Sequence, residues 1–192
     1  MKVCILLGNT RTKSNTEKLA KVFGENLEAK GIDVVQIPLR AKTIQTCVGC
    51  NKCHDVFDSF GCVINDDMRE ISQEILSSDL IVLTSPIYSW MPTPPLKAVM
   101  DRMYAFTKYP EDGEAFNLMT KQLFAMIATS DEPCEENCDL FDEAVTRLAG
   151  FANRPYLGSL TARAQEVENV IEQKVLDDAK AFAEKCIRAF GK

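Results

Sequence analysis

The 192-residue sequence predicts an α/β fold: a doubly wound, five-stranded parallel sheet with helices on both faces. Short, continuous apolar runs alternate along the chain with longer segments of helical periodicity. Strands buried on both faces and crossover helices produce this alternation. Hydrophobic residues make up 46% of the chain, enough to fill one sizeable core. No repeat, low-complexity tract or linker interrupts it, so residues 1–192 are expected to form a single domain.

Five segments are expected to be the strands of this sheet. The first follows Met1-Lys2 as an uninterrupted apolar run that ends before Gly8, and the others are similarly short and apolar. The expected strands are Val3–Leu7, Asp33–Ile37, Leu80–Leu83, Gln122–Ala128 and Tyr156–Leu160.

Five further segments have the spacing of apolar residues that one face of a helix requires. Gly31 is expected to end the first of them, Asp66 or Asp67 can cap the second, and Pro95 suits the first turn of the third. The expected helices are Thr16–Ala29, the segment from Asp66 or Asp67 to Ser77, Pro95–Phe106, Asp139–Gly150 and Gln165–Phe190.

The charge and the apolar pattern exclude several classes of partner. A net charge of −6 and a pI near 5.0 argue against nucleic acid, which needs a basic face. No apolar stretch approaches the length that spans a bilayer, and the short run after Met1 does not resemble a signal peptide. We therefore expect a cytoplasmic protein without membrane or nucleic-acid partners. In a reducing compartment its eight cysteines indicate metal ligands, redox groups or buried thiols rather than disulfides.

The segment after the first strand could bind an anion. It reads Gly8-Asn9-Thr10-Arg11-Thr12-Lys13-Ser14-Asn15-Thr16 and leads into the first helix, whose first backbone N–H groups have no partner within the helix. Hydroxyl and amide side chains at a helix N-terminus suit a phosphate, to which Arg11 or Lys13 could add charge. The alternative is an ordinary N-cap formed by Ser14 or Asn15 with nothing bound. The position at the carboxyl end of a central strand favours phosphate.

Two other loops leave the same edge of the predicted sheet. Ser85-Pro86-Ile87-Tyr88-Ser89-Trp90-Met91-Pro92 is apolar and aromatic, which suits the wall of a flat ring. Alternatively, Tyr88 and Trp90 simply pack this loop onto the core. The third loop begins at Thr129. Because ligands of doubly wound sheets bind outside the carboxyl ends of the strands, these loops are the candidate site.

Four of the eight cysteines fall within sixteen residues, in an insertion at about residues 40–64. Three of them recur at every third position, so their sulfurs could converge on one centre. They are Cys47, Cys50, Cys53 and Cys62. The set could hold a 4Fe–4S cluster or a structural zinc ion, or consist of free thiols that survive from an ancestral cluster. The eight residues between Cys53 and Cys62 form a long gap, which Phe57, Phe60 and Gly61 could close by folding back.

The remaining cysteines and the single histidine receive simpler interpretations. Cys4 and Cys186 are expected to be core thiols. Cys134 and Cys138 are expected in a solvated acidic loop with Asp139 capping the next helix, and a redox pair is the alternative. Neighbouring carboxylates would raise their pKa values and make them poor nucleophiles. His54 is expected to be solvated rather than a metal ligand.

Taken together, these motifs resemble the flavodoxin-like NAD(P)H-dependent FMN reductases. The run from Gly8 to Thr16 is similar to that family's phosphate loop, and Thr84–Tyr88 with Pro95–Arg102 is similar to its second flavin loop and the following helix. The compact cysteine set followed by Ile64-Asn65-Asp66-Asp67-Met68 resembles its iron–sulfur flavoprotein branch. The resemblance covers nearly the whole chain, although Asn9 and Thr10 stand where many relatives have serine and proline.

The resemblance implies a fold, cofactors and site residues. It implies a flavodoxin-like domain that binds FMN, uses NAD(P)H as co-substrate and holds a 4Fe–4S cluster on the four cysteines, with the flavin rather than a side chain carrying the chemistry. The FMN phosphate would be held by Thr10, Arg11, Ser14, Asn15 and Thr16. The ribityl chain and ring would be lined by Pro86, Ile87, Tyr88, Ser89 and Trp90, and the pocket completed by Thr129, Ser130 and Asp131.

The implied function is that of an FMN-dependent oxidoreductase. Electrons would pass from NAD(P)H, or from a reduced carrier such as ferredoxin, to a quinone, oxygen or a protein. The alternatives are a flavodoxin-like electron carrier without enzymatic activity, a cluster-free NAD(P)H:flavin reductase, and a regulatory protein that has lost the cofactor. Phe106, Tyr109 and Phe116 would need cover beyond the sheet core, so a homodimer or homotetramer is expected.

Overall fold

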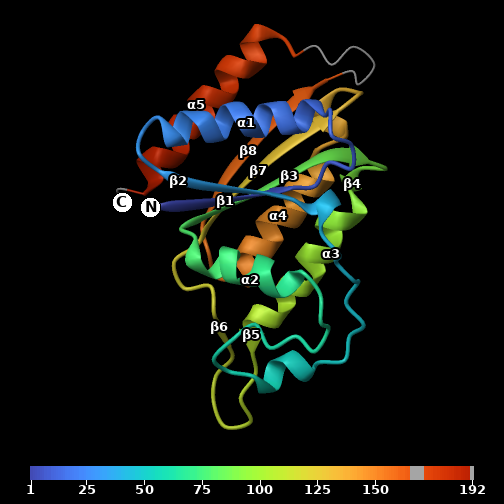
Figure 1. The fold of residues 1–192 in the computed structure, drawn as a ribbon, viewed down its shortest axis with the longest axis vertical. Helices are drawn as coiled ribbons and strands as arrows, with labels where there is room; N and C mark the ends of the chain where they lie inside the picture. The colour runs from blue at the N-terminus through green and yellow to red at the C-terminus, as the bar shows by residue number, and fades with distance from the viewer. Residues whose placement is uncertain (165–170, 191–192) are drawn as a thin grey trace.

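The computed structural model, which describes residues 1–164 and 171–190, contains the predicted parallel sheet (Figure 1). Its strands lie in the spatial order β2-β1-β3-β7-β8, all parallel, so the strand order reverses beside β1 and β3. This is the flavodoxin-like order, in which ligands bind at the carboxyl edge near the reversal. The five strands are β1 (Lys2–Leu7), β2 (Asp33–Pro38), β3 (Leu80–Tyr88), β7 (Leu123–Ser130) and β8 (Tyr156–Arg163).

Helices cover both faces of the sheet, as predicted. Helices α1 and α5 pack on one face, and α2, α3 and α4 pack on the other (Figure 1). Alternate residues of β1 divide accordingly, since Val3 and Ile5 face the first pair while Cys4 and Leu6 face the other three. The helices are α1 (Asn15–Glu28), α2 (Met68–Ser77), α3 (Pro94–Arg102), α4 (Asp139–Phe151) and α5 (Gln173–Ala189).

Several predicted boundaries were wrong. The third helix ends at Arg102 rather than Phe106, and the fifth strand continues to Arg163 rather than ending at Leu160. The third strand does not end at Leu83 but continues to Tyr88, where a two-residue turn joins it to the short antiparallel strand β4 (Met91–Pro92). The last helix begins at Gln173 and not at Gln165, because residues 171–172 are not helical and residues 165–170 lie outside the described part. The spacing of apolar residues does not locate the first residue of a helix when no clear capping signal accompanies it.

The cysteine-bearing segment forms a lobe below the sheet together with a second, two-stranded sheet (Figure 1). That sheet pairs β5 (Thr107–Lys108) with β6 (Phe116–Asn117) and was not predicted. Phe60 is buried against Phe106, so the loop between Cys53 and Cys62 does fold back. A Cβ atom at Gly61, whose φ is +68°, would lie 2.5 Å from the Val56 Cβ, so the turn there requires glycine.

None of the helices in residues 1–164 and 171–190 is both long enough and apolar enough to cross a bilayer.

Candidate functional site

The N-terminus of α1 has the features of an anion site. Ser14 occupies the N-cap position with extended backbone, yet its side chain makes no capping hydrogen bond. Ser14, Asn15 and Thr16 are all buried, whereas Thr10 and Arg11 are exposed. Buried hydroxyl groups at a helix N-terminus are what a phosphate needs. The simple N-cap interpretation does not account for the Ser14 side chain.

The residue that joins β1 to this loop, Gly8, is held tightly in place. The Gly8 amide donates to the Thr84 carbonyl at 2.8 Å, and the Thr93 hydroxyl donates to the Gly8 carbonyl. A Cβ at Gly8 would lie 2.6 Å from the Thr84 oxygen, so no other residue fits here without a shift. The loop therefore starts from a rigid point on the sheet.

Asn9 is a site residue that was not predicted from the sequence. Its amide nitrogen donates to the Arg11 carbonyl at 2.6 Å and to Glu17 at 2.7 Å, while its buried Oδ1 has no hydrogen-bond partner among the described residues. Arg40 neutralises Glu17 through two contacts of 3.1 and 3.2 Å. An unpaired buried acceptor is unusual and indicates that a ligand binds at this site.

Two hydrogen bonds bring the three predicted loops together. The Thr16 and Thr129 hydroxyls lie 2.6 Å apart, which joins α1 to the end of β7. The Thr10 hydroxyl lies 3.3 Å from the Tyr88 hydroxyl, which joins the phosphate loop to the end of β3. Loops separated by more than seventy residues in the sequence thus meet at one edge of the sheet.

The aromatic loop is a tight hairpin rather than an irregular loop. Ser89 and Trp90 form its turn with φ values of +48° and +65°. Residues other than glycine and asparagine seldom adopt this backbone conformation. Pro86 is buried and Ile87 half-buried, whereas Tyr88, Ser89 and Trp90 are exposed, so Tyr88 and Trp90 do not pack onto the core. Exposed aromatics on a strained turn are consistent with a ligand-binding wall. At the third loop Thr129 and Ser130 are buried and Asp131 is exposed.

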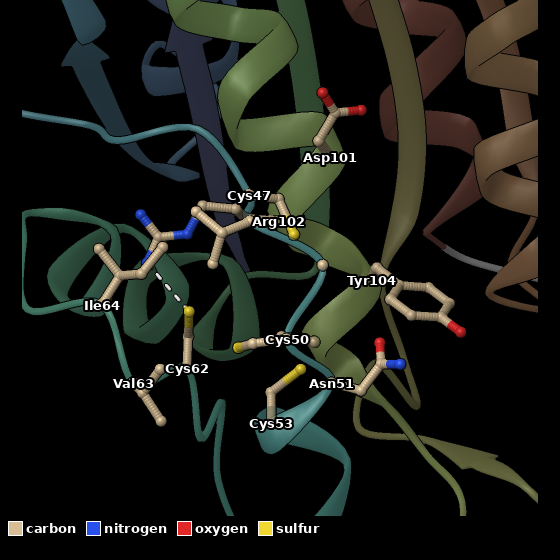
Figure 2. Close-up of a pocket in the computed structure, with 13 residues that line it drawn as sticks. Cys47, Cys50, Asn51, Cys53, Cys62, Val63, Ile64, Asp101, Arg102 and Tyr104 are labelled. Atoms are coloured by element: carbon tan, nitrogen blue, oxygen red, sulfur yellow. Dashed lines mark hydrogen bonds between the residues drawn. The ribbon is translucent and has the colours of Figure 1, made fainter.

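The four clustered cysteines line one small, mostly apolar cavity of about 100 Å³ (Figure 2). Cys53 and Cys62 are half-buried, and Cys47 and Cys50 are exposed at its mouth. Within the described residues, no group of three or more His, Cys, Asp or Glu side chains is placed to hold a metal ion. The structure thus brings the four sulfurs to one cavity without arranging them around a centre. Four cysteine thiols are the donor set that a 4Fe–4S cluster uses.

Two buried cations support this cavity, and neither was predicted from the sequence. The Arg102 guanidinium, 1% exposed, lies 2.5 Å from the Asp66 carboxylate and donates to the Cys62 Sγ at 3.3 Å (Figure 2). The Lys108 ammonium donates to the carbonyl oxygens of Cys53 and Phe60 at 2.9 and 3.3 Å. Positive charge beside the cavity would stabilise thiolates over thiols.

The pKa values follow from burial and these charges. Burial alone would raise the pKa of Asp66, but hydrogen bonds from Arg102 and from the amides of Gln45 and Met68 hold it below its ordinary value. Asp67 occupies the N-cap position of α2 but its side chain makes no capping bond, whereas the Asp66 carboxylate, one residue earlier, accepts the Met68 amide at 3.1 Å. Burial, reinforced by Cys62, raises the pKa of Cys53.

Some expectations for single residues were confirmed and others were wrong. Cys4 and Cys186 are buried core thiols, and burial raises the pKa of each to about 12. His54 is not solvated: its ring packs 4.8 Å from Tyr104 and 4.7 Å from Tyr109, measured between ring centroids. Phe106 is fully buried and needs no cover from a partner.

Comparison with known proteins agrees with this geometry. The sequence model of the NADPH-dependent FMN reductase family matches residues 1–133. An iron–sulfur flavoprotein of Archaeoglobus fulgidus is 32% identical over 110 residues, which is 57% of this chain and 49% of that protein. The chain therefore matches about half the length of this relative.

Solved structures show the same fold at low identity. The NAD(P)H:quinone oxidoreductase of Methanothermobacter marburgensis superposes with a TM-score of 0.71 at 14% identity, covering 97% of this chain and 96% of that one. An FMN-dependent NADH-azoreductase of Bacillus anthracis superposes with a TM-score of 0.67 at 18% identity, covering 100% and 99%. Relatives named iron–sulfur flavoproteins match this chain over about half of their own length, and the family match over residues 1–133 shows that the chain belongs to the NADPH-dependent FMN reductase family.

Proposed function

We propose that the protein is an FMN-dependent oxidoreductase that takes electrons from NAD(P)H or from a reduced carrier such as ferredoxin and delivers them to a quinone, oxygen or a protein. The observation that carries the proposal is the buried, uncapped N-terminus of α1, tied to the ends of β3 and β7 by the Thr10–Tyr88 and Thr16–Thr129 contacts. Family membership supports FMN as the ligand of this site.

Each part of the site has a physical task. Ser14, Asn15 and Thr16, with the amides of the first turn of α1, would bind the phosphate, and the exposed Arg11 would add charge. The strained hairpin of β3 and β4 would present Tyr88 and Trp90 to one face of the flat ring, while Thr129, Ser130 and Asp131 would close the other side. Bound FMN would supply the hydride and electron chemistry.

We further propose that Cys47, Cys50, Cys53 and Cys62 hold a 4Fe–4S cluster, which would supply one-electron chemistry. The shared cavity and the adjacent Arg102 and Lys108 support this assignment over spectator thiols. Arg102 would remain hydrogen-bonded to Cys62, and Lys108 would offset part of the negative charge that four thiolates bring. Binding requires the mouth of the cavity, where Cys47 and Cys50 are exposed, to close.

The cluster and the flavin of one chain would lie at opposite ends of α3. The flavin hairpin precedes Pro94, and the cysteine cavity contacts Arg102, so the length of a nine-residue helix, about 13 Å, separates them. This separation favours a path from the cluster to the flavin of a neighbouring subunit. The exposed aromatic side chains of the cysteine lobe, which are Phe57, Tyr104, Tyr109 and Phe116, with Phe151 beside them, offer a surface for that contact.

A homodimer or homotetramer is therefore expected at micromolar concentration. Replacing Tyr109 and Phe116 by serine should lower the molar mass measured by sedimentation equilibrium, because both rings are about two-fifths exposed. Replacing Met1, an exposed apolar residue outside the lobe, is the control and should leave the mass unchanged. A wild-type protein that sediments only as a monomer would contradict the expectation.

The function is tested by following flavin reduction in the anaerobic protein. The Cys50→Ala variant should lose iron and reduction by ferredoxin while keeping bound FMN and reduction by NAD(P)H, because Cys50 lines the cysteine cavity and not the flavin edge. Cys186→Ala, which removes a buried core thiol elsewhere, should behave like the wild type in both assays. If Cys50→Ala keeps full ferredoxin-linked activity, the cluster assignment is wrong.

The same experiment separates the enzyme from an electron carrier. The net charge of −6 would suit docking of a carrier to basic partners. Rapid reduction by ferredoxin with negligible NAD(P)H turnover would favour the carrier, whereas steady NAD(P)H turnover with quinone or oxygen supports the oxidoreductase.

A further inference from the structure

A pair of thiols outside the cysteine cavity lies just beyond the carboxyl end of β7. Cys134 is half-buried in a single helical turn, and Cys138 is 2% exposed at the N-cap of α4. The Cys138 amide donates to the Cys134 carbonyl at 2.8 Å, so one turn of backbone separates the two residues. This burial corrects the expectation of a solvated loop, and Asp139 begins α4 rather than capping it.

Both sulfurs share one polar partner. The Ser130 hydroxyl lies 3.5 Å from the Cys134 Sγ and 3.7 Å from the Cys138 Sγ. The Cys138 thiol donates to the Ser130 hydroxyl, which in turn donates to the Glu132 carbonyl at 2.6 Å. Cys138 packs in the apolar core, as Cys4 does, but unlike Cys4 it also has the Ser130 hydroxyl and a second thiol beside it. This convergence of two sulfurs on one hydroxyl prepares one sulfur to react and places the second sulfur beside it.

The surroundings make the two thiols unequal. A hydrogen bond from Cys138 lowers the pKa of Cys134 to about 6, with help from Ser130 and Thr161, although burial and Glu135 act in the opposite direction. The same hydrogen bond, burial and Asp139 raise the pKa of Cys138. The sequence suggested that acidic neighbours would raise the pKa of Cys134 and make it a poor nucleophile. The pKa is lowered instead, because close hydrogen bonds outweigh more distant charges.

We infer that Cys134 and Cys138 form a redox-active dithiol that exchanges with disulfide substrates, with Cys134 as the attacking sulfur and Cys138 as the resolving one. The half-buried position of Cys134 lets a substrate reach it, and the burial of Cys138 keeps the second sulfur for the internal step. The substrate class is a small-molecule or protein disulfide.

The exchange balances without a further reagent. The Cys134 thiolate attacks one sulfur of a disulfide R–S–S–R, forms a mixed disulfide and releases one thiolate. Cys138 then loses its proton and attacks the Cys134 sulfur, which releases the second thiolate and leaves a Cys134–Cys138 disulfide. Two protein thiols are oxidised and one substrate disulfide is reduced to two thiols.

Returning the pair to the dithiol takes two electrons and two protons. One hydride and one proton supply this amount, so regeneration at this site rests on the proposed reductase function. Ser130 ends β7 directly after Thr129, which contacts Thr16 of the phosphate loop, so the pair lies beside the candidate flavin site. The exchange itself requires no flavin.

The test uses flavin-free protein, so that its failure is distinct from failure of the reductase proposal. Reduced protein is pulsed with iodoacetamide from about pH 4 to about pH 9, and peptide mass spectrometry reads each cysteine separately. Alkylation of Cys134 should be half-maximal near pH 6. Cys138→Ala should move this midpoint towards the ordinary thiol value of about 8.5. Ser130→Ala should move the midpoint in the same direction, and it provides the test if Cys138→Ala does not fold.

Glutathione disulfide is the exchange probe. The wild type should give a linked Cys134–Cys138 peptide that has lost two hydrogen atoms, whereas Cys138→Ala should stop at glutathione bound to Cys134. Cys4→Ala, which removes a buried thiol of β1, should react like the wild type. A Cys134 that titrates as an ordinary thiol, or a wild type that gives no linked peptide, overturns the inference.

Discussion

Replacing Ser14 and Thr16 by alanine is expected to weaken FMN binding by about 2–6 kcal/mol, or roughly 30-fold to 10⁴-fold. Each buried hydrogen bond lost to the phosphate costs about 1–3 kcal/mol. Both hydroxyls are buried at the N-terminus of α1, and that of Ser14 is not used as a cap. The dissociation constant is measured by quenching of FMN fluorescence on titration with flavin-free protein.

Two controls make the result specific. Thr12→Ala removes an exposed hydroxyl of the same loop and should leave the affinity unchanged. Thr129→Val removes the contact of 2.6 Å with Thr16 but keeps both phosphate-loop hydroxyls, so it shows how much of the loss comes from joining α1 to β7. Equal affinities of the double variant and the wild type would place the phosphate elsewhere.

Replacing Arg102 by methionine is expected to lower the free energy of unfolding by about 3–5 kcal/mol, because it leaves the Asp66 carboxylate buried without its cation. Arg102 and Asp66 are each 1% exposed, and Asp66 also accepts hydrogen bonds from the amides of Gln45 and Met68. The pair therefore joins the end of α3 to both ends of the cysteine-bearing segment.

Lys97→Met is the matched control on the same helix. Lys97 pairs with Asp101 at 2.6 Å, but both side chains are nearly half exposed. An exposed pair of this kind contributes about 0.2–1 kcal/mol, so urea denaturation of the metal-free proteins should show a much smaller loss. Equal destabilisation by the two substitutions would contradict the structural role of Arg102.

The same ion pair predicts a pH dependence of stability. Since the pKa of Asp66 is lowered by folding, its contribution is fully present above the unfolded value of about 3.9 and is lost as the pH falls through the folded value. Arg102→Met should reduce this loss on acidification, because the carboxylate then no longer gains from ionisation.

The sequence predicted the architecture because the fold depends on local periodicity. Apolar runs such as Leu80–Leu83 and the stripe of α1 identify strand and helix without knowledge of partners. The extension of β3 to Tyr88 was missed because it pairs with a two-residue strand across a turn of Ser89 and Trp90, residues that do not signal such a turn.

The site was predictable only where neighbouring residues in sequence form it. Ser14, Asn15 and Thr16 are adjacent in the chain and meet the other loops at the edge that parallel strands define. Arg102 and Asp66 are 36 residues apart, and nothing in their local sequence indicates that they pair in the interior. Likewise, Cys138 lies in an acidic stretch that looks solvated, and only the packing of α4 against the sheet buries it.

The central claim is that this chain is an FMN-dependent oxidoreductase with a 4Fe–4S cluster. It is tested most directly by analysing flavin, iron and acid-labile sulfide in anaerobically purified protein, together with its absorption spectrum. The account predicts one FMN, four irons and four sulfides per chain, which corresponds to one flavin site and one cluster on four cysteines. FMN without iron would contradict the cluster, and a colourless protein that stays colourless after addition of FMN would contradict the claim as a whole.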